Sequence, residues 1–262
     1  MSDRRQRQKE MRAAKRETER KQKARKELGR RLITALVFGL IVVGIFALGG
    51  LFGRGETDIP ASYEDYRDQA TACDAAQPPA EAVMTFAAPE QQADISEGST
   101  VTATITTSCG EIVIDLNTSA APETVNSFVF LAREGFYDGQ VLHRIVENFV
   151  FQGGDPSADG TGGPGYFISD EFPEDGFVYE EGVVAMANRG ARTTGSQFFV
   201  VTGDDGRFLT NSFNVLGTVI SGDDAIRRVM EVETAQAPGS NERSLPLESV
   251  YVEAVTIEVS DS

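Results

Sequence analysis

An uncharged run of 21 residues, Leu32–Phe52, divides the chain into two unequal parts. At about 1.5 Å of rise per residue, a helix of this length crosses a hydrocarbon core roughly 30 Å thick. The apolar region of a secretory signal is shorter, about 7–15 residues, and ends in a small-residue cleavage site. Ala47-Leu48-Gly49 is a poor version of that site. We therefore expect a single retained transmembrane helix at 32–52, with a cleaved signal as the alternative.

The two parts carry opposite charge. Residues 1–31 hold 14 Lys+Arg against 5 Asp+Glu, a balance of +9, and the remainder has a balance of −25. Positive charge beside a membrane span marks its cytoplasmic side. We expect a single-pass protein of the cell membrane with a cytoplasmic basic leader and an acidic extracytoplasmic part. A nucleic-acid partner is not expected, because a domain of charge −25 repels phosphates.

Beyond the span, the composition changes once more near residue 99. Residues 53–98 are rich in Ala, Pro, Gln, Glu and Asp. Such a composition favours an extracytoplasmic linker, in which only Tyr63–Ala75 has the character of a short helix. From residue 99 to 262 β-branched and apolar residues recur, and this range is expected to be the folded domain.

The domain reads as many short strands with two helices. The alternating runs VTATITTS and EIVIDL, separated by Cys109-Gly110, predict a hairpin. The segment PETVNSFVFLAREG predicts an amphipathic helix that begins near Pro122 and ends at Gly135. Further strands are expected at 141–145, 149–153, 182–187, 197–201, 214–219 and 250–259, and a second helix at 222–229. This pattern favours a closed β-barrel over a layered α/β sheet.

Several motifs of other enzyme classes fail on their context. Residues 160–165 fit G-x-G-x-x-G literally, but a proline interrupts the stretch and no amphipathic helix follows. A phosphate-binding Walker loop is excluded because this region has no lysine. Ser196 and the distant His143 could indicate a hydrolase, but the G-x-S-x-G elbow is absent.

Four separated blocks carry a resemblance to a known family. The order HRI-x-x-x-F-x-x-QGGD, GTGGPGY, MAN and GSQFF resembles the cyclophilin-type peptidyl-prolyl cis/trans isomerases, from about Ile95 to Ser262. The resemblance implies a mainly β fold, an eight-stranded antiparallel closed barrel capped by two helices, with a proline pocket on its outer face. It also implies catalysis without a cofactor, acting on proline-containing polypeptides.

The same motif positions imply the site residues. Arg144 is the expected catalytic group, because its planar cation can donate to the prolyl carbonyl and to the nitrogen lone pair that appears when the amide twists. His143 is expected at the pocket edge, since this reaction transfers no proton. The resemblance assigns substrate binding to His143, Phe149, Val150, Gln152, Ala187, Asn188, Gln197, Phe199, Phe208, Leu209 and Phe213.

Four residues depart from the commonest form of the family. Phe208 stands where tryptophan is frequent, and Phe213 where histidine or tyrosine is usual. Both changes put strong binding of the family's cyclic-peptide drug in doubt. Arg189 and Arg192 stand between MAN and GSQFF, where small or neutral residues are more typical, and are expected to favour acidic residues upstream of proline. Pairing with neighbouring carboxylates is the alternative for both arginines.

The two cysteines, Cys73 and Cys109, both lie in the part expected outside, where disulfides persist. We expect them to pair with each other, with two unpaired thiols as the alternative. A zinc site is not expected, because His143 is the only histidine and such a site needs three or four ligands.

Taken together, the residues predict a membrane-tethered peptidyl-prolyl isomerase that assists folding of exported or surface proteins. A non-catalytic proline-peptide-binding or scaffold module on the same fold is the alternative. Retention of Arg144, Phe149, Gln152, Asn188 and Gln197 favours the enzyme.

Overall fold

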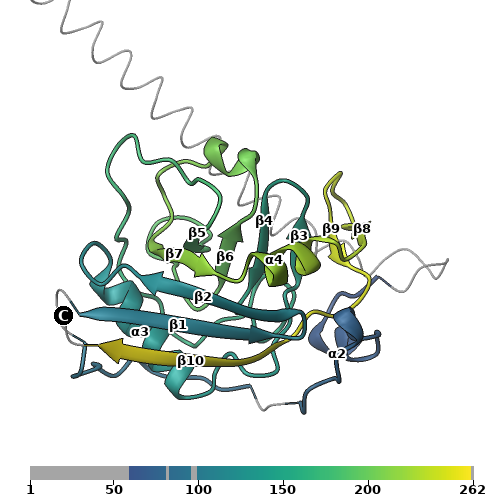
Figure 1. The fold of residues 1–262 in the computed structure, drawn as a ribbon, viewed down its shortest axis with the longest axis horizontal. Coiled ribbons are helices and arrows are strands. Elements are labelled where there is room, and N and C mark those ends of the chain that lie inside the picture. Colours follow the sequence, from purple (N-terminus) through teal and green to yellow (C-terminus); the bar gives the residue numbers. More distant parts are fainter. Residues whose placement is uncertain (1–58, 81–82, 96–98, 261–262) are drawn as a thin grey trace, which may run out of the picture. The chain divides into compact units, whose positions relative to one another are not determined.

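The computed structural model describes residues 59–80, 83–95 and 99–260 (Figure 1). The predicted leader and the predicted span at 32–52 lie outside the described residues. Among the residues that are described, no helix has both the length and the apolar character needed to cross a membrane.

One antiparallel sheet of eight strands forms the centre of the domain, in the order β10-β1-β2-β7-β5-β6-β4-β3 (Figure 1). Its strands are β1 (Thr100–Thr107), β2 (Gly110–Leu116), β3 (Arg144–Val146), β4 (Val150–Gly153), β5 (Val183–Met186), β6 (Phe198–Val201), β7 (Val215–Ser221) and β10 (Val252–Ser260). The hairpin, the two helices and the other predicted strands are therefore present, with ends shifted by up to three residues.

The sheet is not a closed barrel, so that part of the predicted fold is wrong. It is a curled half-barrel whose edge strands are β10 and β3. Near these edges the chain is joined by an isolated bridge between Val141 and Tyr251, and the Leu142 amide donates to the Val250 carbonyl at 2.8 Å. With only three residues in β3, these contacts do not extend into a ladder.

The two faces of the sheet bury separate apolar clusters. Because successive residues of a strand point to opposite faces, Phe198 and Val200 enter the main core while Phe199 and Val201 do not. Helices α3 (Pro122–Arg133) and α4 (Asp223–Met230) pack on the sheet, with Phe128 of α3 fully buried in the main core. The second cluster consists of Val150, Tyr179, Val183, Ala185, Phe199, Val201 and Val215.

The described part of the predicted linker packs against the domain rather than standing apart as a spacer. It contains the short helix α2 (Tyr63–Arg67) and the 3₁₀ turn η1 (Ala72–Asp74). Tyr66 of α2 is buried and donates through its hydroxyl to the His143 carbonyl at 2.9 Å. Further along, the ring of Phe86 meets that of Phe130 edge-on, with centroids 5.0 Å apart.

Cys73 and Cys109 form a disulfide, as predicted, with their Cα atoms 5.2 Å apart. The bond joins η1 to the turn between β1 and β2 across 36 positions of sequence. Cys109 is fully buried in the main core. The segment before the domain is therefore covalently fixed to the first hairpin.

A second, two-stranded sheet was not predicted. It consists of β8 (Thr234–Gln236) and β9 (Arg243–Pro246), and Figure 1 shows this hairpin beside β3. A separate 3₁₀ turn, η2 (Asp204–Phe208), follows β6.

Candidate active site

Arg144 lies on edge strand β3, directly opposite Gln152 of β4 in the antiparallel register. Its Nη1 donates to the Gln152 Oε1 at 3.4 Å. Its Cζ lies 5.5 Å from the centre of the Phe149 ring, in the range of a cation–π contact. Strand pairing thus places the predicted catalytic arginine, one predicted amide and one predicted ring together.

Glu242 holds the same arginine from the loop between β8 and β9. The Arg144 Nε donates to one carboxylate oxygen at 2.9 Å and Nη2 donates to the other at 2.8 Å. The two side chains are 22% and 24% exposed, so the pair is largely removed from water. Burial by itself raises the pKa of Glu242, but the hydrogen bond and charge of Arg144 outweigh it, and that pKa lies below its usual range.

A chain of amides continues from Gln152 along the site. Its Nε2 donates to the Gln197 Oε1 at 2.9 Å, and the Gln197 Nε2 donates to the Gly162 carbonyl at 2.9 Å and to Asp155 at 3.3 Å. The turn at the end of β4 requires Gly154, whose φ is +80° and whose added Cβ would lie 2.4 Å from the Ser196 carbonyl. That turn places the Asp155 carboxylate where it accepts from the Gln197 side chain.

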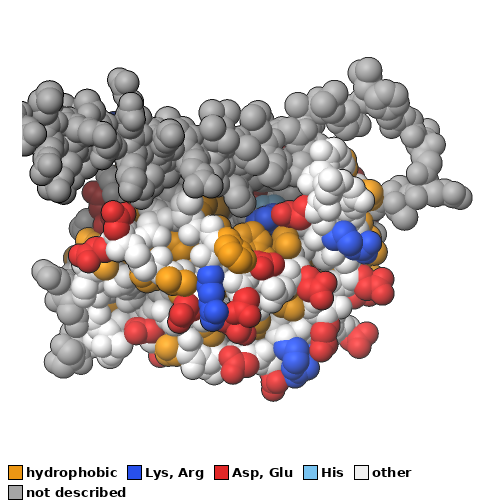
Figure 2. Space-filling view, turned by 90° about the horizontal axis from the view of Figure 1, so that it is seen from above, with side chains coloured by type: hydrophobic (Ala, Val, Ile, Leu, Met, Phe, Trp, Pro, Cys, Tyr) orange, Lys and Arg blue, Asp and Glu red, His pale blue; other side chains and the backbone are white. Residues whose placement is uncertain are grey.

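The second apolar cluster lies next to these polar groups. Phe199 is paired with Gln152 across the β4–β6 ladder, and its ring meets Phe213 edge-on with centroids 5.4 Å apart. Phe149, Ala187, Leu209 and Phe213 are partly buried and pack against the cluster. On the face shown in Figure 2, hydrophobic side chains gather near the middle, with acidic side chains spread around them. A compact apolar ring such as proline matches this composition.

The remaining predicted residues differ in their exposure and in their hydrogen bonds. Val150 is buried beneath the others in the second cluster, and Phe208 is 83% exposed on η2. The Asn188 side chain donates to the Ser212 carbonyl at 2.7 Å and accepts from the Gly190 amide at 3.1 Å, so its amide shapes its own loop. The Ala187 amide donates to the Gln197 carbonyl at 2.8 Å.

His143 is buried at 5% exposure, and its Nδ1 has no hydrogen-bond partner among the described residues. Burial lowers the pKa of His143 below its usual range, Asp155 acts in the opposite direction, and Arg144 lowers it further. The ring is therefore neutral near pH 7. This state suits a structural residue behind Arg144 better than a proton carrier.

Arg189 and Arg192 are exposed on the loop after β5. Their backbone amides are fixed by Thr193 and Asp170 at 2.8 and 2.7 Å. Neither guanidinium forms an ion pair with any described residue. Pairing with carboxylates, the alternative for these two residues, is therefore not seen among the described side chains.

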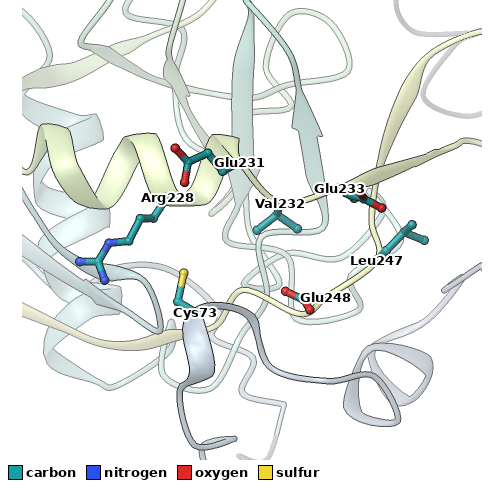
Figure 3. A pocket seen from close by; sticks show the side chains of 7 residues that line it. All are labelled: Cys73, Arg228, Glu231, Val232, Glu233, Leu247 and Glu248. Carbon is teal, nitrogen blue, oxygen red and sulfur yellow. The ribbon is translucent and has the colours of Figure 1, made fainter.

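A cavity formed by described residues lies elsewhere, beside the disulfide (Figure 3). It has a volume of about 500 Å³ and is lined by Cys73, Arg228, Glu231, Val232, Glu233, Leu247 and Glu248. None of the predicted substrate-binding residues contributes to it. Among the described residues no group of His, Cys, Asp or Glu is arranged to hold a metal ion.

One residue of the site escaped the sequence analysis. Glu242 lies in the segment APGSNERSLP, which has no apolar alternation and no motif that would connect it to Arg144. The two residues are 98 positions apart. The one local signal is that Glu242 directly precedes Arg243, and an acidic residue next to an arginine is common in this chain.

The fold is a curled antiparallel sheet, and one of its faces carries an arginine held by hydrogen bonds, a chain of amides and an apolar cluster. Residues 102–257 match the model of the "Cyclophilin type peptidyl-prolyl cis-trans isomerase/CLD" family. The match spans more than half of the chain. The chain therefore belongs to the cyclophilin-type peptidyl-prolyl cis-trans isomerases, and it is an enzyme of that class.

Named relatives agree with this assignment. A "Peptidyl-prolyl cis-trans isomerase B" of Streptomyces anulatus is 41% identical over 172 residues, which cover 60% of this chain and 95% of the relative. A "Peptidyl-prolyl cis-trans isomerase A" of Mycobacterium tuberculosis (strain ATCC 25618 / H37Rv) is 38% identical and is covered to 92%. The fold is similar to that of a Cryptosporidium parvum cyclophilin-type isomerase, with a TM-score of 0.55, 23% identity, and 63% and 99% of the two chains covered.

Proposed function

We propose that this isomerase acts on X-Pro bonds of exported or surface proteins and assists their folding outside the cytoplasm, tethered through residues 32–52. The observation that carries the catalytic part is the ordered position of Arg144 between Glu242 and Gln152, next to the apolar surface around Phe199. Proline-containing polypeptides are the proposed substrates.

The chemistry needs no bond to break. Resonance gives the amide a rotation barrier of roughly 18–20 kcal/mol, and unaided X-Pro exchange takes tens to hundreds of seconds. In the twisted state the nitrogen regains a lone pair, which accepts a hydrogen bond that the planar amide cannot accept. A guanidinium placed at this nitrogen binds the twisted state more strongly than the ground state. Lowering the barrier by about 7 kcal/mol would supply roughly five decades of rate.

The location is supported by three features of the chain. The disulfide between Cys73 and Cys109 suits an oxidising compartment. The uncharged run at 32–52 and the charge difference between leader and remainder fit a single span with a cytoplasmic N-terminus. An acidic exterior also keeps the domain soluble and away from anionic lipid.

The catalytic part is tested by replacing Arg144. The full chain in detergent is expected to accelerate cis/trans exchange of a short X-Pro peptide, and Arg144→Ala is expected to lower kcat/KM by at least about a hundredfold, the loss of a dominant charge-stabilising group. Arg227→Ala, on the exposed face of α4, is the matched control. Equal rates for Arg144→Ala and the unchanged chain would refute the assignment, and peptide binding without any turnover would favour the scaffold alternative.

The topology is tested with a tag at each end of the chain. In spheroplasts, added protease is expected to remove a tag after Ser262 and to leave a tag before Met1 intact, because the acidic part lies outside. The chain should pellet with membranes and be extracted only by detergent. The reverse tag pattern, or a soluble chain that starts near Gly50, would contradict the proposal.

A further inference from the structure

We infer that Glu242 is a positioning residue for Arg144, through which the β8–β9 hairpin contributes to the isomerase site. The inference rests on the proposed catalytic role of Arg144. Its basis is the side-on pair described above, in which both carboxylate oxygens accept from the same guanidinium at 2.9 and 2.8 Å.

The pair leaves the reactive edge of the guanidinium available. An arginine has five N–H donors in a fixed planar fork. Glu242 takes the Nε–H and one N–H of Nη2, and Gln152 takes one N–H of Nη1. One N–H on each Nη remains for a ligand. These two donors are available to a prolyl carbonyl and the neighbouring nitrogen.

The hairpin loop holds the backbone of Glu242 in place. The Glu242 amide donates to the Ser240 hydroxyl at 3.0 Å, and the Ala237 amide donates to the Glu242 carbonyl at 2.9 Å. The Gln236 side chain closes the same loop by donating to the Ser240 carbonyl at 2.6 Å. Strand β9 packs beside β3, which keeps the loop next to Arg144.

Fixing the arginine before the substrate arrives has a kinetic meaning. A long side chain held on both flanks does not have to be ordered at the moment of reaction, so the interaction made in the twisted state is stronger. The apolar surface that binds the proline ring does not include Glu242. Loss of Glu242 should therefore reduce kcat and leave KM nearly unchanged.

The test separates kcat from KM by NMR exchange measurements at low and saturating X-Pro peptide, using the full chain. Glu242→Ala is expected to reduce kcat about tenfold with KM changed less than twofold, since hydrogen bonds to charged groups typically have this effect. Glu242→Gln keeps the size and one acceptor oxygen, and its kcat should lie between those of Glu242→Ala and the unchanged chain. Glu233→Gln, exposed at the foot of the hairpin, makes the same change of charge and should leave both constants unchanged.

A second readout does not depend on turnover. The Arg144 Nε–H should exchange with solvent more slowly in the unchanged chain than in Glu242→Gln. This comparison does not require Glu242→Ala to fold. A kcat of Glu242→Ala and Glu242→Gln equal to or above that of the unchanged chain would overturn the inference, as would a raised KM at constant kcat. If Arg144→Ala itself were fully active, the proposed function would fail first, so the two failures are distinguishable.

Discussion

At the scale of single residues, the site depends on how a few polar side chains share their hydrogen bonds. Gln152 accepts from Arg144 through its oxygen and donates to Gln197 through its nitrogen, so its amide has one usable orientation. Gln197 is fixed in turn by the Gly162 carbonyl. The sequence motifs predicted these residue types, but the pair with Glu242 depends on a contact between segments far apart in sequence, for which no local pattern exists.

The exposed pair Arg189 and Arg192 leads to a prediction on substrate choice. Both guanidinium groups lack ion pairs with the described residues, so they can attract a carboxylate of the substrate. Surface charge pairs contribute about 0.2–1 kcal/mol and are screened by salt. A peptide with Glu two or three residues before proline should therefore be turned over a few-fold faster than its Lys counterpart at low salt, and equally fast at high salt.

The comparison needs both peptides at both salt concentrations, and the double variant Arg189→Gln/Arg192→Gln as control. This variant should treat the two peptides alike. Identical kcat/KM for the Glu and Lys peptides on the unchanged chain at low salt would leave the arginines without a role in specificity.

At the scale of elements, the quality of the prediction followed the strength of the local pattern. Alternation of Val101, Ala103 and Ile105 with threonines predicted β1, and the proline and glycine around α3 predicted its ends. The hairpin β8–β9 has strands of three and four residues without alternation, and it was missed. Single apolar residues among Ala and Pro give no period, so the sequence around Phe86 predicts a spacer, although its ring packs on Phe130 of α3.

Closure of the sheet could not be derived either. Whether two edge strands pair depends on their length and on contacts between residues about a hundred positions apart. β3 has three residues, and a ladder with β10 would need a longer partner. The closed barrel was inferred both from the pattern of many short strands with two helices and from the resemblance to the family, and neither contains the length of the edge strand β3.

At the scale of the whole molecule, the disulfide joins the described part of the predicted linker to the sheet and should add measurably to stability. In the chain-entropy model a closed loop of this size contributes about 4 kcal/mol. Replacing both cysteines, as Cys73→Ser with Cys109→Ala, should lower the free energy of unfolding in urea by roughly 2–4 kcal/mol. The isomerase activity of the folded variant should be unchanged, because neither cysteine contacts Arg144 or the second cluster.

Two controls bear on this prediction. Reduction of the unchanged chain should bring its urea midpoint close to that of the variant, and reduction of the variant should have no effect. An unchanged free energy of unfolding in the variant would show that the hydrogen bonds of α2 and η1 hold the segment without covalent help.

The same bond also decides what a single cut in the backbone can separate. Residues 74–108 form a covalently closed ring between Cys73 and Cys109. A nick anywhere in that ring yields two fragments that travel together on a non-reducing gel and part only with a thiol reagent. A nick upstream of α2 frees the catalytic domain, because neither the disulfide nor the contacts of α2 then connect it to the preceding segment. For the tether proposed above, a shedding protease would therefore have a productive target only upstream of α2, and the ring would tolerate proteolytic damage without release of the enzyme.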